Sequence, residues 1–214
     1  MTDAQGHPRN ALEPRRKPAQ ARSRLRVDAI LDAVAELLVE RGFDAITTRL
    51  IAEKAGIPVG SIYQFFPNKY AIFNVLGVRY LDRFTQVYKD IITAEAQDQT
   101  WEELLDGGID AFSSVIYADE AVTILWAGMQ NSPELHASEA QHRASAVEYN
   151  LAILNRVLPH VQPERRRLIA WVMVRVLDAL LYHASREKDE RKAQVIAELK
   201  QLLKAYVASH VPAG

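Results

Sequence analysis

Apolar residues recur at helical spacing over most of this chain. Between residues 27 and 38 they fall three and four positions apart, which places them on one face of a helix. The same spacing returns over residues 72–91 and again over residues 195–207. No stretch alternates apolar and polar residues as a half-buried strand does. The pattern therefore predicts an all-α protein of about nine helices.

Capping residues mark where these helices begin and end. Gly42 is expected to end the first helix, and Thr47 to cap a short second helix that ends at Gly56. Pro58 suits the first position of a third helix because its missing N–H costs nothing there, and Asn68 is expected to cap a long fourth. Later starts are predicted at Thr100, near Asp119, at Ser132-Pro133, at Gln162-Pro163 and near Lys188.

The composition is that of an ordinary soluble protein. The 214 residues are 49 % hydrophobic and 25 % charged, and they include no cysteine, which excludes disulfides, thiolate metal sites and cysteine nucleophiles. The first 17 residues are polar and contain proline, unlike a secretory signal, so a cytoplasmic location is expected. The apolar stretch 168–182 is shorter than the roughly 20 residues that cross a bilayer, so no membrane association is expected.

The net charge of −1 conceals an uneven distribution. Residues 1–70 carry 11 Lys and Arg against 8 Asp and Glu, a net charge of +3, and residues 71–214 carry 15 against 19, a net charge of −4. Seven of the cations lie within residues 1–27. This distribution predicts a flexible basic arm over residues 1–22, ahead of a body of mixed charge.

Residues 46–65 have the pattern of a helix-turn-helix motif, two short helices joined by a turn that contains glycine. Arg49 and Lys69 stand at helix starts, where the helix dipole favours acidic residues instead. An anion held there by backbone N–H groups and the side chain would compensate, and a DNA phosphate is such an anion. The alternative is that both are ordinary solvated charges.

The third helix exposes polar groups that suit a DNA groove. Gln64 can bond an adenine edge with two hydrogen bonds, and the hydroxyls of Ser61 and Tyr63 suit a base edge or a phosphate. Gly60 costs helix stability, which the close approach of another backbone would explain. Tyr63 could instead be a core tyrosine with a solvated hydroxyl group.

Residues 47–69, TTRLIAEKAGIPVGSIYQFFPNK, follow a helix that ends in Glu40-Arg41-Gly42-Phe43. In this order they resemble the DNA-binding domain of the TetR family of transcriptional regulators, over residues 23–83. Beyond residue 83 only the length and the number of helices match. The resemblance implies a homodimer that binds a palindromic double-stranded DNA operator, usually as a repressor, and releases it when a small molecule enters the C-terminal domain, residues 84–214.

The resemblance also assigns DNA contacts residue by residue. The start of the second helix is placed at the DNA backbone, the third helix in the major groove, and Lys69 on a phosphate. Many members have Ser-Lys where this chain has Pro58-Val59, so an apolar contact replaces a charged one. The DNA-contacting residues so assigned are Thr47, Thr48, Arg49, Pro58, Val59, Gly60, Ser61, Tyr63, Gln64 and Lys69.

The last two helices, about residues 163–185 and 189–209, could form half of an intersubunit four-helix bundle or close the core of the subunit itself. Residues 168–182 are expected to be buried nearly all round, with Arg175 and Asp178 forming a charge pair within the subunit or across the dimer interface. An effector pocket would be apolar with few polar groups, and Trp126, Met129, Tyr149 and Met173 are the residues expected to line it. An apolar or aromatic effector is favoured.

No catalytic site, cofactor or metal is expected. His136 and His142 are six residues apart and do not share a helix face, unlike a metal-binding pair at i, i+4. The alternatives to a DNA-binding regulator are an all-helical enzyme with a hydrophobic substrate and a helical adaptor. The enzyme would need a convergent set of catalytic groups that does not stand out here.

Overall fold

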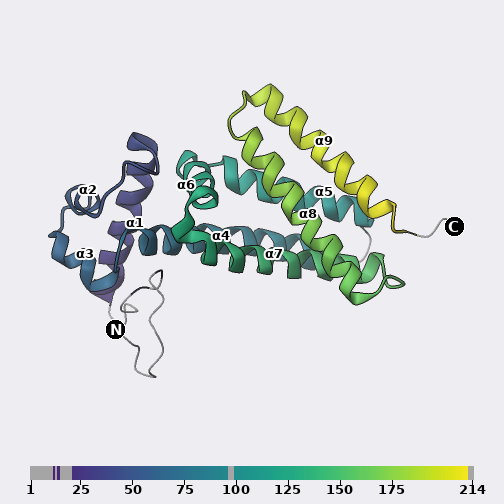
Figure 1. Cartoon of the computed structure of the whole chain (residues 1–214), viewed down its shortest axis with the longest axis horizontal. Helices are drawn as coiled ribbons and strands as arrows, with labels where there is room; N and C mark the ends of the chain where they lie inside the picture. The colour runs from purple at the N-terminus through teal and green to yellow at the C-terminus, as the bar shows by residue number, and fades with distance from the viewer. Residues whose placement is uncertain (1–11, 13, 15–20, 96–98, 212–214) are drawn as a thin grey trace, which may run out of the picture. The chain divides into compact units, whose positions relative to one another are not determined.

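The computed structural model describes residues 12, 14, 21–95 and 99–211, without the side chains of residues 21–22, 83–85, 87–95 and 136–142. This part of the chain forms helices and no strand, which confirms the all-α prediction (Figure 1). The helices are α1 (Ala21–Arg41), α2 (Thr48–Lys54), α3 (Val59–Phe65), α4 (Lys69–Glu95), α5 (Trp101–Tyr117), α6 (Glu120–Asn131), the 3-10 helix η1 (Pro133–Leu135), α7 (His136–Val157), α8 (Pro163–Ala184) and α9 (Asp189–Ala208).

Several helices begin at the predicted capping residues, whereas Pro58 precedes α3 as its N-cap instead of taking its first position, and the start predicted at Ser132-Pro133 begins the 3-10 helix η1. The side-chain oxygens of Thr47, Asn68 and Asp119 accept hydrogen bonds from Leu50 N, Ala71 N and Ala121 N, at 3.2, 2.9 and 2.8 Å. Thr100 and Glu103 form the reciprocal capping box. Gly42 and Gly56 have φ angles of 77° and 64°, in the left-handed region that ends a helix most easily at glycine.

The chain divides into two compact units. The first combines residues 1–82 with residues 118–139, and the second combines residues 83–117 with residues 140–214. The first unit reaches residue 82 before the chain passes into the second, and the expected domain ranges, residues 23–83 and 84–214, stay predictions. Residues 118–139 differ, because they were expected within the C-terminal domain and instead pack with the first unit.

Close packing explains why α6 joins the first unit. A Cβ atom at Gly128 would lie 2.2 Å from the ring of Phe43, so only glycine allows α6 this close to the end of α1. The Phe43 ring in turn packs against Phe73 of α4, with 4.6 Å between the centroids. Met129 Sδ lies 3.0 Å from the position that a Cβ of Gly77 would take. Two glycines thus remove the bulk that would keep α6 away.

Ion pairs fix the orientation of the short helix α2. Lys54, at its end, pairs with Glu36 and Glu40 of α1 at 2.8 and 2.6 Å. The hydrogen bonds to Glu36 and Glu40 raise the pKa of Lys54 above its usual value. Arg79 of α4 pairs with Asp32 of α1 at 3.1 Å. Both α2, the first helix of the helix-turn-helix, and α4, the helix that follows the motif, are therefore attached to α1.

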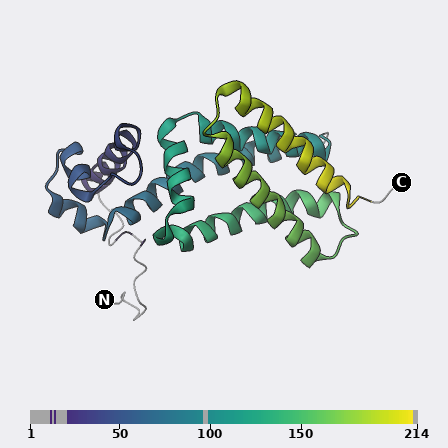
Figure 2. The ribbon, with the colours of Figure 1, turned by 45° about the horizontal axis from the view of Figure 1, so that its top comes forward.

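In the second unit α8 and α9 run side by side in opposite directions (Figure 2). Lys200 and Lys204 of α9 pair with Asp110 and Asp106 of α5 at 2.6 and 2.8 Å. The hydroxyl of Tyr117, at the end of α5, donates to the carbonyl oxygen of Leu181 at 2.7 Å. Burial raises the pKa of Tyr117 to about 12, so the phenol remains a donor at neutral pH.

One face of α8 is exposed, which corrects the expectation of a helix buried all round. Leu168 and Trp171 are 46 % and 49 % exposed, and Leu202 of α9 is 49 % exposed. The opposite face of α8 is buried within the second unit and includes Ile169, Ala170, Met173, Val174 and Leu181. The apolar residues of α8 are therefore divided between a buried face and an exposed face. Within the described residues, no helix has the length and apolarity needed to span a membrane.

Most of the expected basic arm, residues 1–22, lies outside the described residues. Leu12 is described, and its side chain is buried, with 6 % exposed. Its carbonyl oxygen accepts a hydrogen bond from Asn74 Nδ2 of α4 at 3.2 Å.

Candidate functional site

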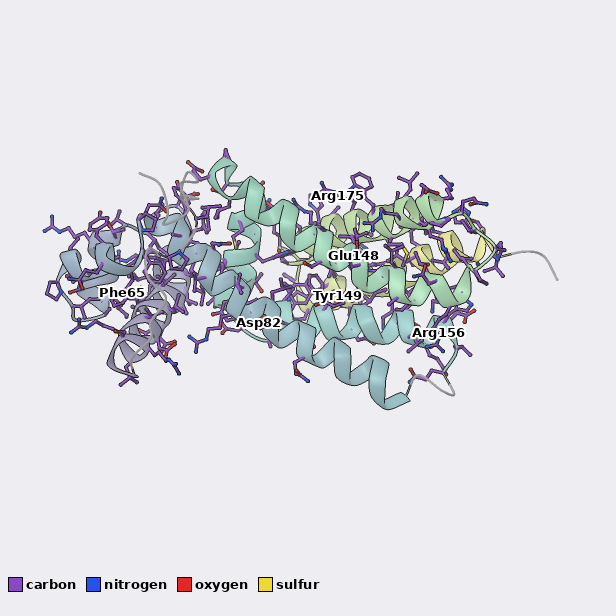
Figure 3. The ribbon with its side chains drawn as sticks, turned by 90° about the horizontal axis from the view of Figure 1, so that it is seen from below. Phe65, Asp82, Glu148, Tyr149, Arg156 and Arg175 are labelled. Atoms are coloured by element: carbon purple, nitrogen blue, oxygen red, sulfur yellow. The ribbon has the colours of Figure 1, made fainter. Side chains whose placement is uncertain are left out.

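Helix α3 has a buried face and an exposed face. Ile62 and Phe65 are buried, and Figure 3 places Phe65 within the group formed by α1, α2 and α3. Val59 and Tyr63 are 36 % and 40 % exposed, and Gln64 is exposed as well. A helix fixed by two buried side chains therefore presents apolar, phenolic and amide groups on its outer surface.

The structure links this exposed face to α2. Thr48 Oγ1, in the first turn of α2, lies 3.0 Å from the hydroxyl oxygen of Tyr63, within hydrogen-bond distance. The two residues are 15 positions apart in sequence, so the spacing of apolar residues gave no indication of this contact. The bond fixes the phenol ring beside the start of α2. Tyr63 is 40 % exposed, so it lies at the surface and not in the core.

Arg49 and Lys69 differ in their surroundings. Arg49 is exposed in the first turn of α2. Lys69 Nζ donates to the carbonyl oxygens of Asp44 and Ile46, at 3.3 and 3.0 Å, and lies 5.3 Å from the centre of the Tyr70 ring. Lys69 therefore holds the segment between α1 and α2 in place, a role that the sequence did not indicate.

Gly60 faces open space. No atom of the described chain outside its own helix lies within 4 Å of the position that a Cβ at Gly60 would take. The close approach expected from the sequence thus involves no other part of the described chain. The surface around Gly60 is open to an outside partner.

The second unit contains an apolar cavity of about 70 Å³. Two of the predicted effector residues, Tyr149 and Met173, line it; Tyr149 is labelled in Figure 3 beside the exposed Glu148. The other two, Trp126 and Met129, belong to α6 in the first unit and are not among the residues that line this cavity. The sequence did not pick out the remaining lining residues, which are Leu104, Leu105, Gly108, Ile109, Phe112, Ala146, Asn150, Ile153, Val174, Leu177, Asp178 and Leu203.

The expected pair of Arg175 with Asp178 within the subunit is wrong. Asp178 Oδ2 instead accepts from Arg143 Nε of α7 at 3.3 Å, and these side chains are 13 % and 21 % exposed. The guanidinium of Arg175 lies 5.2 Å from the centre of the Trp171 ring on the exposed face of α8, and Figure 3 shows Arg175 at the outer edge of the second unit. Residues 175 and 178 are close on the helix, but one points outward and the other inward.

No group of described side chains has the composition of a metal site. The side chains of His136 and His142, considered above as a metal-binding pair, lie outside the described residues.

Comparison with known families agrees with this architecture. Residues 30–76, which contain the helix-turn-helix, match the family model described as bacterial regulatory proteins, tetR family. Residues 100–206, half of the chain, match the model of the tetracyclin repressor-like C-terminal domain. The chain belongs to the TetR family. The resemblance seen in residues 47–69 is thereby confirmed and extended beyond residue 83.

Curated relatives within the TetR family match part of the chain. The tetracycline repressor protein class D of Escherichia coli is 32 % identical over 101 residues, which cover 46 % of this chain and 44 % of that protein. The transcriptional repressor KstR2 of Rhodococcus jostii is 35 % identical over 99 residues, which cover 42 % of this chain and 48 % of that protein. The chain thus spans less than half the length of each of these relatives.

Solved TetR-family structures match most of the chain. A TetR-family regulator from Streptomyces coelicolor has a TM-score of 0.61 and 29 % identity, covering 87 % of this chain and 99 % of that one. FadR from Bacillus subtilis, solved in complex with stearoyl-CoA, has a TM-score of 0.66 and 20 % identity, covering 85 % of this chain and 97 % of that one. At 20 % identity the second match concerns the fold alone.

Proposed function

We propose that this chain is a DNA-binding transcriptional repressor that binds a palindromic operator as a homodimer and releases it when a small molecule binds in the second unit. The observation that carries the proposal is the exposed face of α3. Val59, Tyr63 and Gln64 are exposed, the opposite face is buried, and the adjoining α2 presents Arg49. A rigid helix with such a face fits the major groove.

The position of α2 supports the same proposal. In a helix-turn-helix the first helix crosses the DNA backbone while the second reads base edges. Thr47 and Arg49 stand at the N-terminus of α2, where backbone N–H groups and the helix dipole favour a phosphate. The resemblance assigned these same residues, together with Thr48 and Lys69, to the DNA backbone.

The exposed apolar face of α8 supports the homodimer. Leu168 and Trp171 of α8 and Leu202 of α9 are large apolar side chains that are about half exposed, and exposed apolar surface is typical of a protein interface. A second copy related by a two-fold axis would bury the same residues on both sides and form the four-helix bundle expected for residues 163–185 and 189–209. Two recognition helices would then lie roughly 34 Å apart, one turn of DNA.

The cavity of the second unit supports a small-molecule effector. Its lining is mainly apolar and includes Tyr149 and Met173, two of the four residues predicted to contact the effector. The related fold of FadR from Bacillus subtilis was solved with stearoyl-CoA bound, so this fold can hold a ligand with an apolar chain. An effector acts only if it binds one of two conformations more tightly than the other.

A gel-shift experiment tests the proposal. The purified full chain is titrated onto the DNA upstream of its own gene at about 0.15 M salt, with unrelated competitor DNA in excess. Binding that survives the competitor, and that is lost in the Gln64→Ala variant, supports the proposal. No binding at this salt concentration overturns it and favours the enzyme or adaptor alternatives.

The basic arm can be tested in the same experiment. Each phosphate contact contributes a slope of roughly −0.9 to a plot of log affinity against log salt concentration. Neutralising Arg15, Arg16 and Lys17 with glutamine leaves Leu12 in place and removes three cations. If the arm contacts DNA, the slope becomes shallower; an unchanged slope means that the arm is a solubilising leader.

A further inference from the structure

The cavity of the second unit is small and has few polar groups. It measures about 70 Å³, and a second cavity of about 10 Å³ shares Leu105, Asn150, Ile153 and Met173 with it. An engineered apolar cavity of about 150 Å³ is large enough for benzene, so a six-carbon ligand fits here only if the surrounding helices move. Such a ligand prefers the enlarged conformation, which is the property that an effector needs.

Asp178 is the charged residue of the cavity wall. Its carboxylate is paired with Arg143 at 3.3 Å, and both side chains are mostly buried. Arg143 therefore balances the negative charge of Asp178. A ligand that separated the two would leave a buried charge without its partner, which is unfavourable. A carboxylate ligand would be repelled by Asp178, and an ammonium ligand would compete with Arg143. A ligand without charge leaves the pair intact.

The hydrogen-bonding capacity of the wall points to a donor on the ligand. A carboxylate accepts several hydrogen bonds, so Asp178 can accept one from a ligand while it keeps Arg143. Asn150 donates through Nδ2 to the carbonyl oxygen of Ala146 at 2.9 Å, which leaves its amide oxygen as the group to meet a ligand. Both groups are acceptors, and a hydroxyl group is a neutral donor that can bond to one of them.

We propose that the ligand of this cavity is a neutral, mainly apolar molecule with one hydroxyl group, which donates a hydrogen bond to the Asp178 carboxylate. The inference rests on the proposed function only in calling this ligand the effector, because the cavity belongs to the second unit alone. A neutral ligand would distinguish this chain from regulators whose effectors are fatty acids or other carboxylates.

Four six-carbon probes test the chemistry: 1-hexanol, its isomer pentyl methyl ether, hexylammonium and hexanoate. Their dissociation constants for the full chain without DNA are measured by titration calorimetry or by chemical-shift titration. We expect 1-hexanol to bind about tenfold more tightly than the ether, since a hydrogen bond to a charged acceptor is worth at least that factor. The proposal is overturned if any of the other three probes binds as tightly as 1-hexanol. It is also overturned if no probe binds at millimolar concentration.

Variants assign the preference to Asp178. The double variant Arg143→Met, Asp178→Leu removes both partners and so leaves no unpaired buried charge. It is expected to bind hexanol and the ether equally, while Asp110→Asn, which removes an exposed carboxylate paired with Lys200, keeps the preference. The single variant Asp178→Asn, with a weaker acceptor, is expected to reduce the preference and serves if the double variant does not fold.

The outcomes separate this inference from the proposed function. A preference for hexanol that persists in the double variant overturns the role of Asp178, whatever the gel shift shows. If the chain binds hexanol through Asp178 but does not bind its upstream DNA, the ligand site is supported and the proposed function is overturned.

Discussion

The side-chain oxygens of Thr48 and Tyr63 lie 3.0 Å apart, which joins the first turn of α2 to the exposed face of α3. The ring of Tyr63 is 40 % exposed, so this hydrogen bond holds a large side chain in one orientation at the surface proposed to meet DNA. A side chain that is already ordered loses less conformational entropy when it binds. Thr48 is therefore expected to act on DNA through Tyr63.

A double-mutant cycle tests this relationship. Thr48→Val and Tyr63→Phe each remove the hydrogen bond, which is worth about 0.5–1.5 kcal/mol, and each is expected to weaken operator binding roughly two- to tenfold. The two effects should not add, because both substitutions remove the same Thr48–Tyr63 hydrogen bond. Tyr182→Phe, which removes a hydroxyl bonded to Arg186 in the second unit, is the matched control. Additive losses would mean that Thr48 contacts DNA independently of Tyr63.

Arg49 and Lys69 are expected to respond differently to truncation. Arg49→Ala removes an exposed cation, so we expect weaker DNA binding, a salt slope smaller by about one, and an unchanged melting temperature. Lys69→Ala also removes two hydrogen bonds to the carbonyl oxygens of Asp44 and Ile46. We expect it to lower the free energy of unfolding by about 1–3 kcal/mol. Thermal denaturation and salt titration of both variants measure the two effects, and equal melting temperatures would refute the structural role of Lys69.

Substitution of Gly60 is expected to affect DNA binding, whereas substitution of Gly128 is expected to affect folding. Gly60→Ala meets no atom of the described chain outside its own helix, so the better helix propensity of alanine should stabilise the protein by up to about 1 kcal/mol. If DNA approaches this surface closely, the same variant binds the operator less tightly. Gly128→Ala places a Cβ 2.2 Å from the Phe43 ring and is expected to destabilise the first unit. Chemical denaturation and gel shifts are the measurements; a Gly60→Ala variant with unchanged DNA affinity would contradict the close approach.

Local signals in the sequence predicted the elements well. Thr47, Thr100 and Asp119 cap helices where they were expected to, because capping depends on a side chain and on N–H groups two or three residues away. Gly42 and Gly56 end helices because their φ angles are positive. These features are properties of a few neighbouring residues, and a single sequence contains all the information that they need.

Contacts between distant residues were not predictable in this way. The pairing of Asp178 with Arg143 rather than with Arg175, and the bonds from Lys69 to Asp44 and Ile46, depend on how helices pack. The same is true of α6, which Gly128 allows to approach Phe43 although 85 residues separate them in sequence. Of the four predicted effector residues, Tyr149 and Met173 line the cavity because both lie on helices of the second unit, whereas Trp126 and Met129 do not; effector binding by these residues stays a prediction.

The exposed face of α8 is expected to contribute most of the dimerisation free energy through Trp171. Trp171 is 49 % exposed, with the Arg175 guanidinium over its ring at 5.2 Å, and tryptophan and arginine are the residues that most often dominate interface energy. In a two-fold dimer each residue occurs twice, so Trp171→Ala is expected to raise the dimer dissociation constant by at least about thirtyfold, equivalent to about 2 kcal/mol. Sedimentation equilibrium over a range of concentrations measures it. Val39→Ala, which shortens an apolar side chain on α1 that is 47 % exposed, should leave the dimer unchanged. A wild-type chain that stays monomeric, or a Trp171→Ala variant that dimerises as tightly as wild type, would remove this face from the interface.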